Sequence, residues 1–296
     1  MKNTYITTDK PYTYETYISD LSKLLRDFSF LTKETTGHSV LGKPLYAIKF
    51  GEGPKKIIIT AAHHGTEWIT SMLLCALLHC LCEQYSSGDD STFLKNTFYF
   101  IPMVNPDGVN LSIEGITPDL PAHIKNRLFK ICNDGNFKGL WQANIRGIDL
   151  NHNYDASFSK GKAIQISEGI IAPAATKYSG EYPESEPETR AVVNFTKKIS
   201  PDCVIAYHSQ GEEIFYKYQG KCAPDAEEIA KKLSQASGYD LILAEGLTDC
   251  TGYKDWVIEK FNIPAYTIEV GKGKNPLPLS QFDKIFEDNL KLILTL

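Results

Sequence analysis

Apolar positions along the chain recur with two spacings, and each spacing predicts a different element. Short apolar runs bounded by turn residues predict strands, whereas apolar positions at helical spacing predict amphipathic or buried helices. The expected strands cover residues 44–50, 56–61, 97–104, 202–207 and 265–270. The expected helices cover residues 13–31, 68–82, 187–199, 223–237, 253–261 and 280–294, with Ser280 as the N-cap of the last helix.

The order of these elements predicts the fold class. Strands alternate with helices, which is typical of a mostly parallel (mixed) central sheet covered on both faces. The 296 residues contain no internal repeat, low-complexity tract or linker. We therefore expect a single three-layer α/β/α domain over residues 1–296, with its functional groups beyond the carboxyl ends of the strands.

Composition and charge exclude some partners. The net charge of -5 gives no electrostatic reason to expect binding to nucleic acid or to an anionic membrane. The first nine residues have no apolar core or cleavage site, so we expect no secretory signal there, and we find no apolar run long enough to span a bilayer. The sequence leaves open whether a signal peptide was removed. Seven cysteines, an odd number without paired spacing, favour reduced thiols. These features predict a cytoplasmic protein without a nucleic-acid or membrane partner.

Three distant segments carry candidate metal chemistry at or near the ends of predicted strands. The first contains His63, His64 and Glu67, the second ends in His208, and the third contains Glu269. Two imidazoles and one carboxylate make a three-ligand zinc site that leaves a position for water. A further carboxylate could take the proton of that water. His63 and His64 compete as ligands, and their spacing does not choose between them.

Each segment also has a simpler interpretation. A His-x-x-Glu pair occurs by chance in many chains, and a single His208 is more often a hydrogen-bonded core residue than a ligand. Glu269 is harder to explain structurally, because an unpaired carboxylate in an apolar strand has a desolvation penalty of roughly several kcal/mol. A metal ion or another cation nearby would remove that penalty.

Six motifs occur in the order found in one known family. They are His64-Gly65-Thr66-Glu67, Asn105-Pro106-Asp107-Gly108, Gly147-Ile148-Asp149-Leu150-Asn151-His152-Asn153, Ser185-Glu186-Pro187-Glu188-Thr189, Tyr207-His208-Ser209, and Asp255-Trp256 followed by the strand with Glu269. On these motifs the chain resembles the zinc carboxypeptidases of the carboxypeptidase A type over nearly its full length. The resemblance implies a carboxypeptidase A-like fold.

The resemblance also implies roles for matching residues. It chooses the second histidine of the pair, so one zinc ion per chain would be held by His64, Glu67 and His208. Glu269 would be the general base that deprotonates the zinc-bound water and passes the proton to the leaving nitrogen. Arg146 would polarise the scissile carbonyl and stabilise the oxyanion. Among the motif residues, the Gly-x-Asp aspartate, Asp149, is a candidate hydrogen-bond partner for a ligand histidine.

The departures from the family pattern concern the substrate. Asn151 of the terminal-carboxylate clamp is retained, but His152 replaces the arginine that follows it and cannot form a permanent bidentate fork. Lys254 stands at a position that lies in the family's specificity pocket, where a lysine favours an anionic group. With residues 141–151 and 208–212, these features resemble the bacterial γ-D-glutamyl-L-diamino acid peptidases.

The expected function is therefore zinc-dependent hydrolysis of an amide bond in cell-wall-derived peptides, at the γ-D-glutamyl–diamino acid bond of a muropeptide, during recycling inside the cell. One alternative is an ordinary metallocarboxypeptidase that releases carboxyl-terminal amino acids. Another is a catalytically inactive peptide-binding module. The sequence leaves open whether the diamino acid is diaminopimelate or lysine, whether cleavage is endo or exo, the oligomeric state, and whether a polar loop at Ile116–Phe137 forms a lid.

Overall fold

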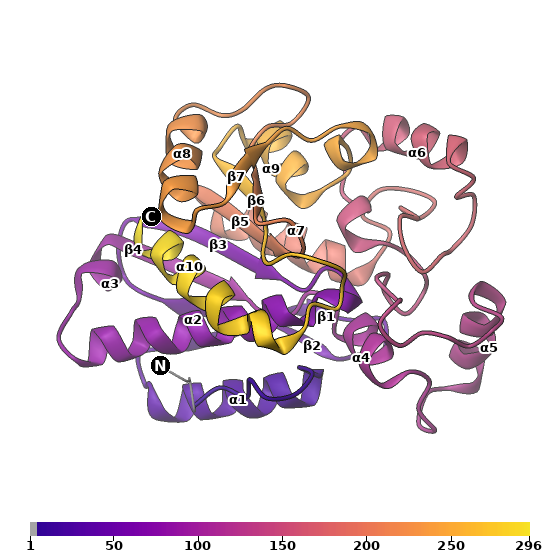
Figure 1. Ribbon diagram of the computed structural model, residues 1–296, viewed down its shortest axis with the longest axis horizontal. Helices are drawn as coiled ribbons and strands as arrows, with labels where there is room; N and C mark the ends of the chain where they lie inside the picture. Colours follow the sequence, from indigo (N-terminus) through magenta and orange to yellow (C-terminus); the bar gives the residue numbers. More distant parts are fainter. Residues whose placement is uncertain (1–4) are drawn as a thin grey trace.

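The computed structural model describes residues 5–296, and one mixed sheet of eight strands runs through these residues (Figure 1). The strands lie in the spatial order β1-β2-β4-β3-β5-β8-β6-β7. The neighbours β4, β3, β5 and β8 are parallel, whereas β1 and β2, β2 and β4, and β6 and β8 pair antiparallel. Their bounds are β1 Thr32–His38, β2 Pro44–Phe50, β3 Lys55–Ala61, β4 Asn96–Ile101, β5 Cys203–His208, β6 Glu213–Phe215, β7 Asp240–Ile242 and β8 Ala265–Glu269.

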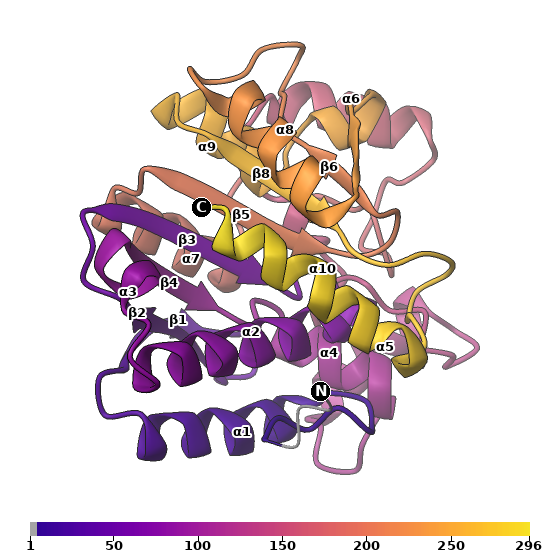
Figure 2. The same ribbon diagram turned by 60° about the vertical axis from the view of Figure 1, so that its left-hand side comes forward.

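Helices cover both faces of this sheet, as the alternation of elements predicts. The helices are α1 Tyr14–Asp27, α2 Trp68–Ser86, α3 Ser91–Lys95, α4 Pro106–Glu114, α5 Ala122–Ile131, α6 Phe158–Ser167, α7 Pro187–Ile199, α8 Ala226–Ser237, α9 Tyr253–Phe261 and α10 Phe282–Leu294. Side chains alternate across a strand, so Ile57 and Ile59 enter the core beneath α1, α2, α8 and α10, while Ile58 enters the core beneath α7 and α9. Figure 2 shows α2 and α10 in front of the sheet and α7 behind it.

Most of the predicted elements are present. Strand β2 and helices α7 and α9 have the predicted bounds, and Thr13 caps α1 by accepting a hydrogen bond from the amide of Thr16. The predicted N-cap Ser280 is wrong. A 3₁₀ turn over Leu279–Gln281 precedes α10, and no side chain caps the helix at its start. The sheet thus confirms the expected α/β class, with more antiparallel pairing at its margins.

Helix α2 corrects the expectation that no apolar run reaches the length of a membrane span. The segment Gly65–Ser86 is long and apolar enough by length and composition, with a mean hydropathy of 1.4. However, 89% of this apolar window is buried inside the fold. Its apolar surface is already covered by the sheet, α1 and α10, so α2 is a core helix.

Residues 116–137 do not form the polar loop that a lid would require. They contain helix α5, whose buried side chains Ile124 and Leu128 join a small apolar cluster with Trp141 and Ile145. This cluster holds residues 116–137 against residues 141–145, which precede the Gly-x-Asp motif. The lid that the sequence left open for Ile116–Phe137 therefore has no support in the packing of these residues.

Candidate metal centre

Three parallel strands end side by side and deliver the predicted site residues to one place. Strands β3, β5 and β8 are neighbours, with Ala61 opposite Tyr207 and His208 opposite Glu269. The carboxyl ends of parallel strands meet at one edge of a sheet, where functional groups usually collect. His208 and Glu269 are thus adjacent because of strand register alone.

The loop after β3 turns sharply so that His64 and Glu67 face the same point. Gly65 allows this turn, because a Cβ there would lie 2.4 Å from the Gly108 carbonyl oxygen and 2.6 Å from that of Trp141. The Gly65 amide donates to the Gln142 carbonyl at 2.8 Å, and a short 3₁₀ turn over Gly65–Glu67 then leads into α2. A backbone hydrogen bond to the segment that contains Gln142 therefore helps to hold the loop in place.

His64, Glu67 and His208 together form a group that could hold a metal ion. One ligand atom from each residue lies within 4.8 Å of the others. His64 Nδ1 lies 2.9 Å from Glu67 Oε1, His208 Nδ1 lies 3.0 Å from Glu67 Oε2, and the two Nδ1 atoms are 3.3 Å apart. Two imidazole nitrogens and a carboxylate facing one point are the donor set of an open zinc site.

Asp149 orients His64, as the sequence predicts. Its Oδ1 lies 3.0 Å from His64 Nε2, so an Nε2–H donated to Asp149 would leave the Nδ1 lone pair for a metal ion. Burial opposes ionisation of Asp149, but His64 and His152 outweigh it and hold the pKa of Asp149 well below its usual value. The competing histidine His63 instead points its Nε2 at the Tyr154 hydroxyl at 3.0 Å. The structure therefore places His64, and not His63, in the group that could hold a metal ion.

Glu269 lies beside the three possible ligands without being one of them. Burial and the nearby Glu67 carboxylate raise the pKa of Glu269 well above its usual value, while His64 acts in the opposite direction. A cation held by the ligands would favour the ionised form. Glu269 also lines a cavity of about 130 Å³ next to His64. It can therefore reach a small molecule in that cavity.

The predicted substrate-binding residues line this same cavity. Asn151, His152 and Lys254 face it together with His64 and Glu269. His152 Nδ1 lies 3.0 Å from the Thr251 hydroxyl, and burial lowers the pKa of His152 although Asp149 opposes this. At neutral pH His152 is therefore an uncharged hydrogen-bonding group.

Lys254 is buried in the cavity wall and already has polar partners. Its ammonium bonds to the carboxylate of Asp255 and to the carbonyl of Lys217. The carboxylate of Asp255 also accepts from the Gly252 amide at the start of α9, at 3.1 Å. An anionic substrate group would therefore share this ammonium with Asp255.

Arg146 lies apart from the cavity that the other site residues line. Its guanidinium faces a separate hollow of about 270 Å³, which also contains Arg127 and Tyr178. Arg146 Nη1 lies 3.4 Å from Glu186 Oε2, and the arginine side chain is 38% exposed. The structure thus does not bring Arg146 together with Glu269, and its predicted role at the scissile carbonyl stays a prediction.

Two polar residues around Glu67 were not singled out from the sequence. Asn275 Nδ2 lies 3.4 Å from Glu67 Oε1, and the Ser209 amide donates to Glu67 Oε2 at 3.3 Å. Ser209 follows His208 directly, which could have indicated its place. Asn275 lies in a glycine- and lysine-rich segment after β8, and only the fold brings it back to the metal centre.

Comparisons with known proteins agree with this geometry. The family model described as zinc carboxypeptidase matches residues 17–292. The chain is 34% identical to γ-D-glutamyl-L-diamino acid endopeptidase 1 of Lysinibacillus sphaericus over 291 residues, 96% of this chain and 71% of that protein.

Solved structures show the same fold. A crystal structure of thrombin-activatable fibrinolysis inhibitor superposes with a TM-score of 0.75 at 19% identity, covering 99% of this chain and 77% of that one. The murein-tripeptide amidase of Escherichia coli O157 superposes with a TM-score of 0.53 at 22% identity, covering 88% of this chain and 91% of that one. With the family match over nearly the whole chain, this protein belongs to the zinc carboxypeptidase family and is a metallopeptidase with a carboxypeptidase A-like fold.

Proposed function

We propose that the protein is a zinc-dependent peptidase that hydrolyses the γ-D-glutamyl–diamino acid bond of cell-wall-derived peptides. The observation that carries this proposal is the cavity in which Glu269 and Lys254 face the same space as the possible ligand His64. The names of two relatives support the substrate class, since one is a γ-D-glutamyl-L-diamino acid endopeptidase and the other a murein-tripeptide amidase.

The metal part of the proposal rests on the donor set. His64, Glu67 and His208 would hold one zinc ion per chain, with Asp149 fixing the tautomer of His64. When bound, zinc lowers the pKa of a coordinated water and polarises the carbonyl of the scissile bond. The three side chains come from two neighbouring strand ends, so the protein scaffold holds their relative positions.

The proton-transfer part rests on Glu269. Its carboxylate would accept a proton from the attacking water and pass that proton to the leaving nitrogen as the amide bond breaks. Glu269 is suited to both steps because it lines the cavity and sits opposite His208 in the sheet. Arg146 would stabilise the oxyanion only after its guanidinium leaves Glu186, and the long 3.4 Å contact between them makes that separation inexpensive.

The substrate part rests on the charges of the cavity. With His152 kept uncharged by burial and His64 bound to zinc as a neutral ligand, Lys254 would be the cationic side chain among the residues that line the cavity. A diaminopimelate side chain carries a second carboxylate, which could share the ammonium with Asp255. Asn151 and His152 would bind other polar groups of the substrate by hydrogen bonds. We further propose a cytoplasmic role in muropeptide recycling, which the unpaired thiols favour.

A comparison of substrates tests the proposal. The zinc-loaded protein is given L-Ala-γ-D-Glu-diaminopimelate, the same peptide with lysine in place of diaminopimelate, and a plain α-linked tripeptide, and the products are identified by mass spectrometry. We expect cleavage of the γ-linked peptides, with the diaminopimelate peptide preferred. Preference for the α-linked tripeptide would instead identify an ordinary carboxypeptidase. Zinc binding without turnover of any peptide would indicate an inactive binding module.

Lys254→Ala sharpens this test. A charge-assisted pair lost from the cavity should weaken kcat/KM for the diaminopimelate peptide by roughly 10-fold or more, at about 1.4 kcal/mol per tenfold change. The lysine peptide should be affected less, because its side chain offers no carboxylate. Equal losses on both peptides would mean that the ammonium serves Asp255 and the fold rather than the substrate.

A further inference from the structure

The carboxylate of Glu67 has four nitrogen neighbours, two on each oxygen. Oε1 lies 2.9 Å from His64 Nδ1 and 3.4 Å from Asn275 Nδ2. Oε2 lies 3.0 Å from His208 Nδ1 and 3.3 Å from the Ser209 amide nitrogen. Each oxygen thus faces one histidine and one N–H donor that is not a possible metal ligand.

Ser209 also fixes the side chain of Asn275. The Ser209 hydroxyl donates to Asn275 Oδ1 at 2.8 Å, and Asn275 Nδ2 donates to the Ser209 carbonyl. With its oxygen used by a hydroxyl donor, the amide presents its NH₂ group to Glu67. The second NH₂ hydrogen is therefore directed at a carboxylate oxygen of a metal ligand.

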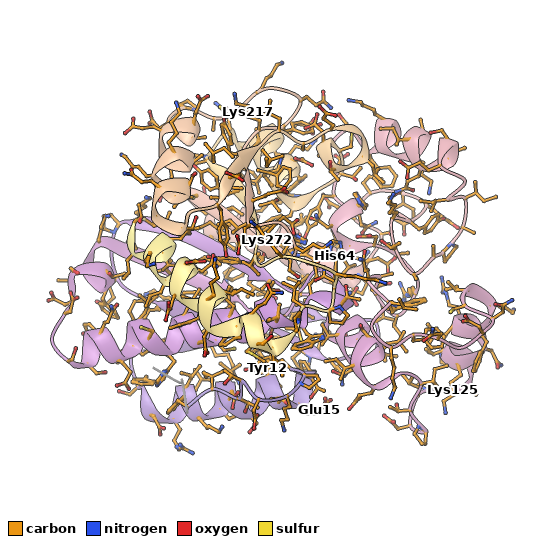
Figure 3. The ribbon with its side chains drawn as sticks, viewed as in Figure 1. Tyr12, Glu15, His64, Lys125, Lys217 and Lys272 are labelled. Carbon is orange, nitrogen blue, oxygen red and sulfur yellow. The ribbon has the colours of Figure 1, made fainter. Side chains whose placement is uncertain are left out.

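The segment that carries Asn275 has a fixed course after β8. The Gly211 amide donates to the Gly271 carbonyl at 2.7 Å, and the Gln281 side chain bonds to both the amide and the carbonyl of Lys272, at 3.0 and 2.7 Å. Gly271 has a φ of +65°, and a Cβ there would lie 2.6 Å from Leu277 Cδ1. Figure 3 labels Lys272 on this segment and His64 at the metal centre.

We propose that Asn275 is a positioning residue for the metal ligand Glu67, an inference that rests on the ligand assignment made above. A hydrogen bond from outside the metal site fixes the direction of a ligand carboxylate, and loss of such a partner typically weakens metal binding by about 10–100-fold. Asn275 acts only through Glu67 in this arrangement. Because its segment begins directly after Glu269, one piece of chain sets both the general base and the orientation of a ligand.

The test measures zinc affinity rather than turnover. Wild type, Asn275→Ala and Lys274→Ala are stripped of metal and titrated with zinc in competition with a chromophoric chelator. We expect Asn275→Ala to bind zinc roughly 10–100-fold more weakly. Lys274→Ala is the matched control, because it changes an exposed neighbour in the same segment and should leave the affinity unchanged.

A second variant covers the case in which Asn275→Ala destabilises the metal-free fold. Ser209→Ala removes only the hydroxyl that orients the Asn275 amide and keeps the backbone donor to Glu67, so it should weaken zinc binding by a smaller factor of roughly 3–10. Thermal unfolding of the metal-free proteins shows which variants keep the wild-type fold.

The outcomes separate this inference from the proposed function. Unchanged zinc affinity in Asn275→Ala and Ser209→Ala would overturn the role of Asn275 while leaving the metal site in place. A fall in turnover at saturating zinc with unchanged affinity would also overturn it, because it would assign Asn275 to the substrate. Failure of the wild type to bind zinc, or wild-type affinity in His208→Ala, would overturn the ligand assignment itself and this inference with it.

Discussion

Two groups of buried carboxylates lie in this protein, and their surroundings differ. Around the metal centre, Glu67 and Asp149 face His64 and His208. Burial opposes ionisation of Glu67, but His64 and His208 outweigh it and lower its pKa to about 2. Nitrogen atoms of two side chains and oxygen atoms of a third meet at a shared point, which is the arrangement that a metal ion requires.

The second group consists of Asp107 in α4 and of Glu186 and Glu188 at the start of α7. Their donors are a backbone amide and one side-chain amide: Glu188 accepts from the Val40 amide at 3.0 Å, and Asn144 Nδ2 donates to Glu186 at 2.8 Å and to Glu188 at 3.3 Å. Burial and the charge of Asp107 raise the pKa of Glu188 to about 8, with backbone N–H donors acting against the shift. These acids join elements of the fold through amide N–H donors, which cannot bind a metal ion.

The difference shows that burial of acids alone does not identify a functional site. Both groups are buried, and both occur in motifs shared with the family. Only the first has histidine nitrogens facing the same carboxylate, so only that group can exchange its internal contacts for a metal ion. The assignment of Arg146 differs between sequence and structure. The family resemblance assigns it to the first group, whereas the structure pairs it with Glu186 of the second.

Removal of a candidate ligand should have the largest effect on activity. If it had no effect, the first group of acids could no longer be distinguished from the second as a metal site. His208→Ala should abolish stable zinc binding and lower turnover by at least on the order of 10³-fold, because two remaining ligands cannot hold the ion that activates water. Chelation of wild type should give the same loss, and added zinc should restore activity. Metal content measured on the purified variants checks this, and full activity in metal-free protein would contradict it.

Glu269→Gln should have the next largest effect. The amide keeps the shape of the side chain but cannot accept a proton, so turnover should fall on the order of 10²–10⁴-fold. Zinc content should stay at the wild-type value, because Glu269 is not among the three possible ligands. Near-normal turnover of this variant would require another general base.

Arg146→Ala decides to which group the arginine belongs. If it stabilises the oxyanion, turnover should fall roughly 10²–10³-fold with little change in stability, and this is the result we expect. Arg127→Ala is the matched control, because it removes a second guanidinium from the same hollow. Wild-type turnover in Arg146→Ala would assign the residue to Glu186 and the fold.

Glu188→Gln tests the second group through the pH dependence of stability. The folded-state pKa of about 8 lies above the value in the unfolded chain, so the contribution of Glu188 to stability is present at low pH and is lost as pH rises toward 8. The Glu188→Gln side chain cannot ionise, so the stability of the variant does not fall in this way as the pH rises. Relative to wild type it should gain on the order of 1–3 kcal/mol between pH 5 and pH 8. Urea unfolding at both pH values measures the difference, and a constant difference would mean that Glu188 is ionised throughout.

The sequence could predict those parts of the fold and site whose signal is local. Helix α7 has a regular apolar stripe and a proline at its start, and β2 has turn residues on both sides, so both were expected with the right bounds. The candidate ligands His64 and Glu67 lie within one short motif, and the register of β5 and β8 places His208 next to Glu269. Parallel neighbours of this kind bring distant residues together at predictable places.

The remaining parts depend on contacts that leave little local pattern. Strand β1 is mostly exposed and polar, so it shows no alternation that would predict a strand. The side chain of Asn275 reaches Glu67 only because a segment more than 200 residues later in the chain folds back over the metal centre. The direction of Arg146 likewise depends on the buried position of Glu186, which no spacing in the sequence shows.

The two margins of the sheet have a consequence for the behaviour of the protein in concentrated solution. Strand β1 carries Lys33 and Glu34, and its pairing with β2 is irregular between Thr35 and Gly37, while β7 at the other margin has only three residues. Charged side chains, a bulge and a short outer strand all hinder the addition of a strand from another chain. The open hydrogen-bonding groups of an eight-stranded sheet are thereby protected against β-sheet aggregation.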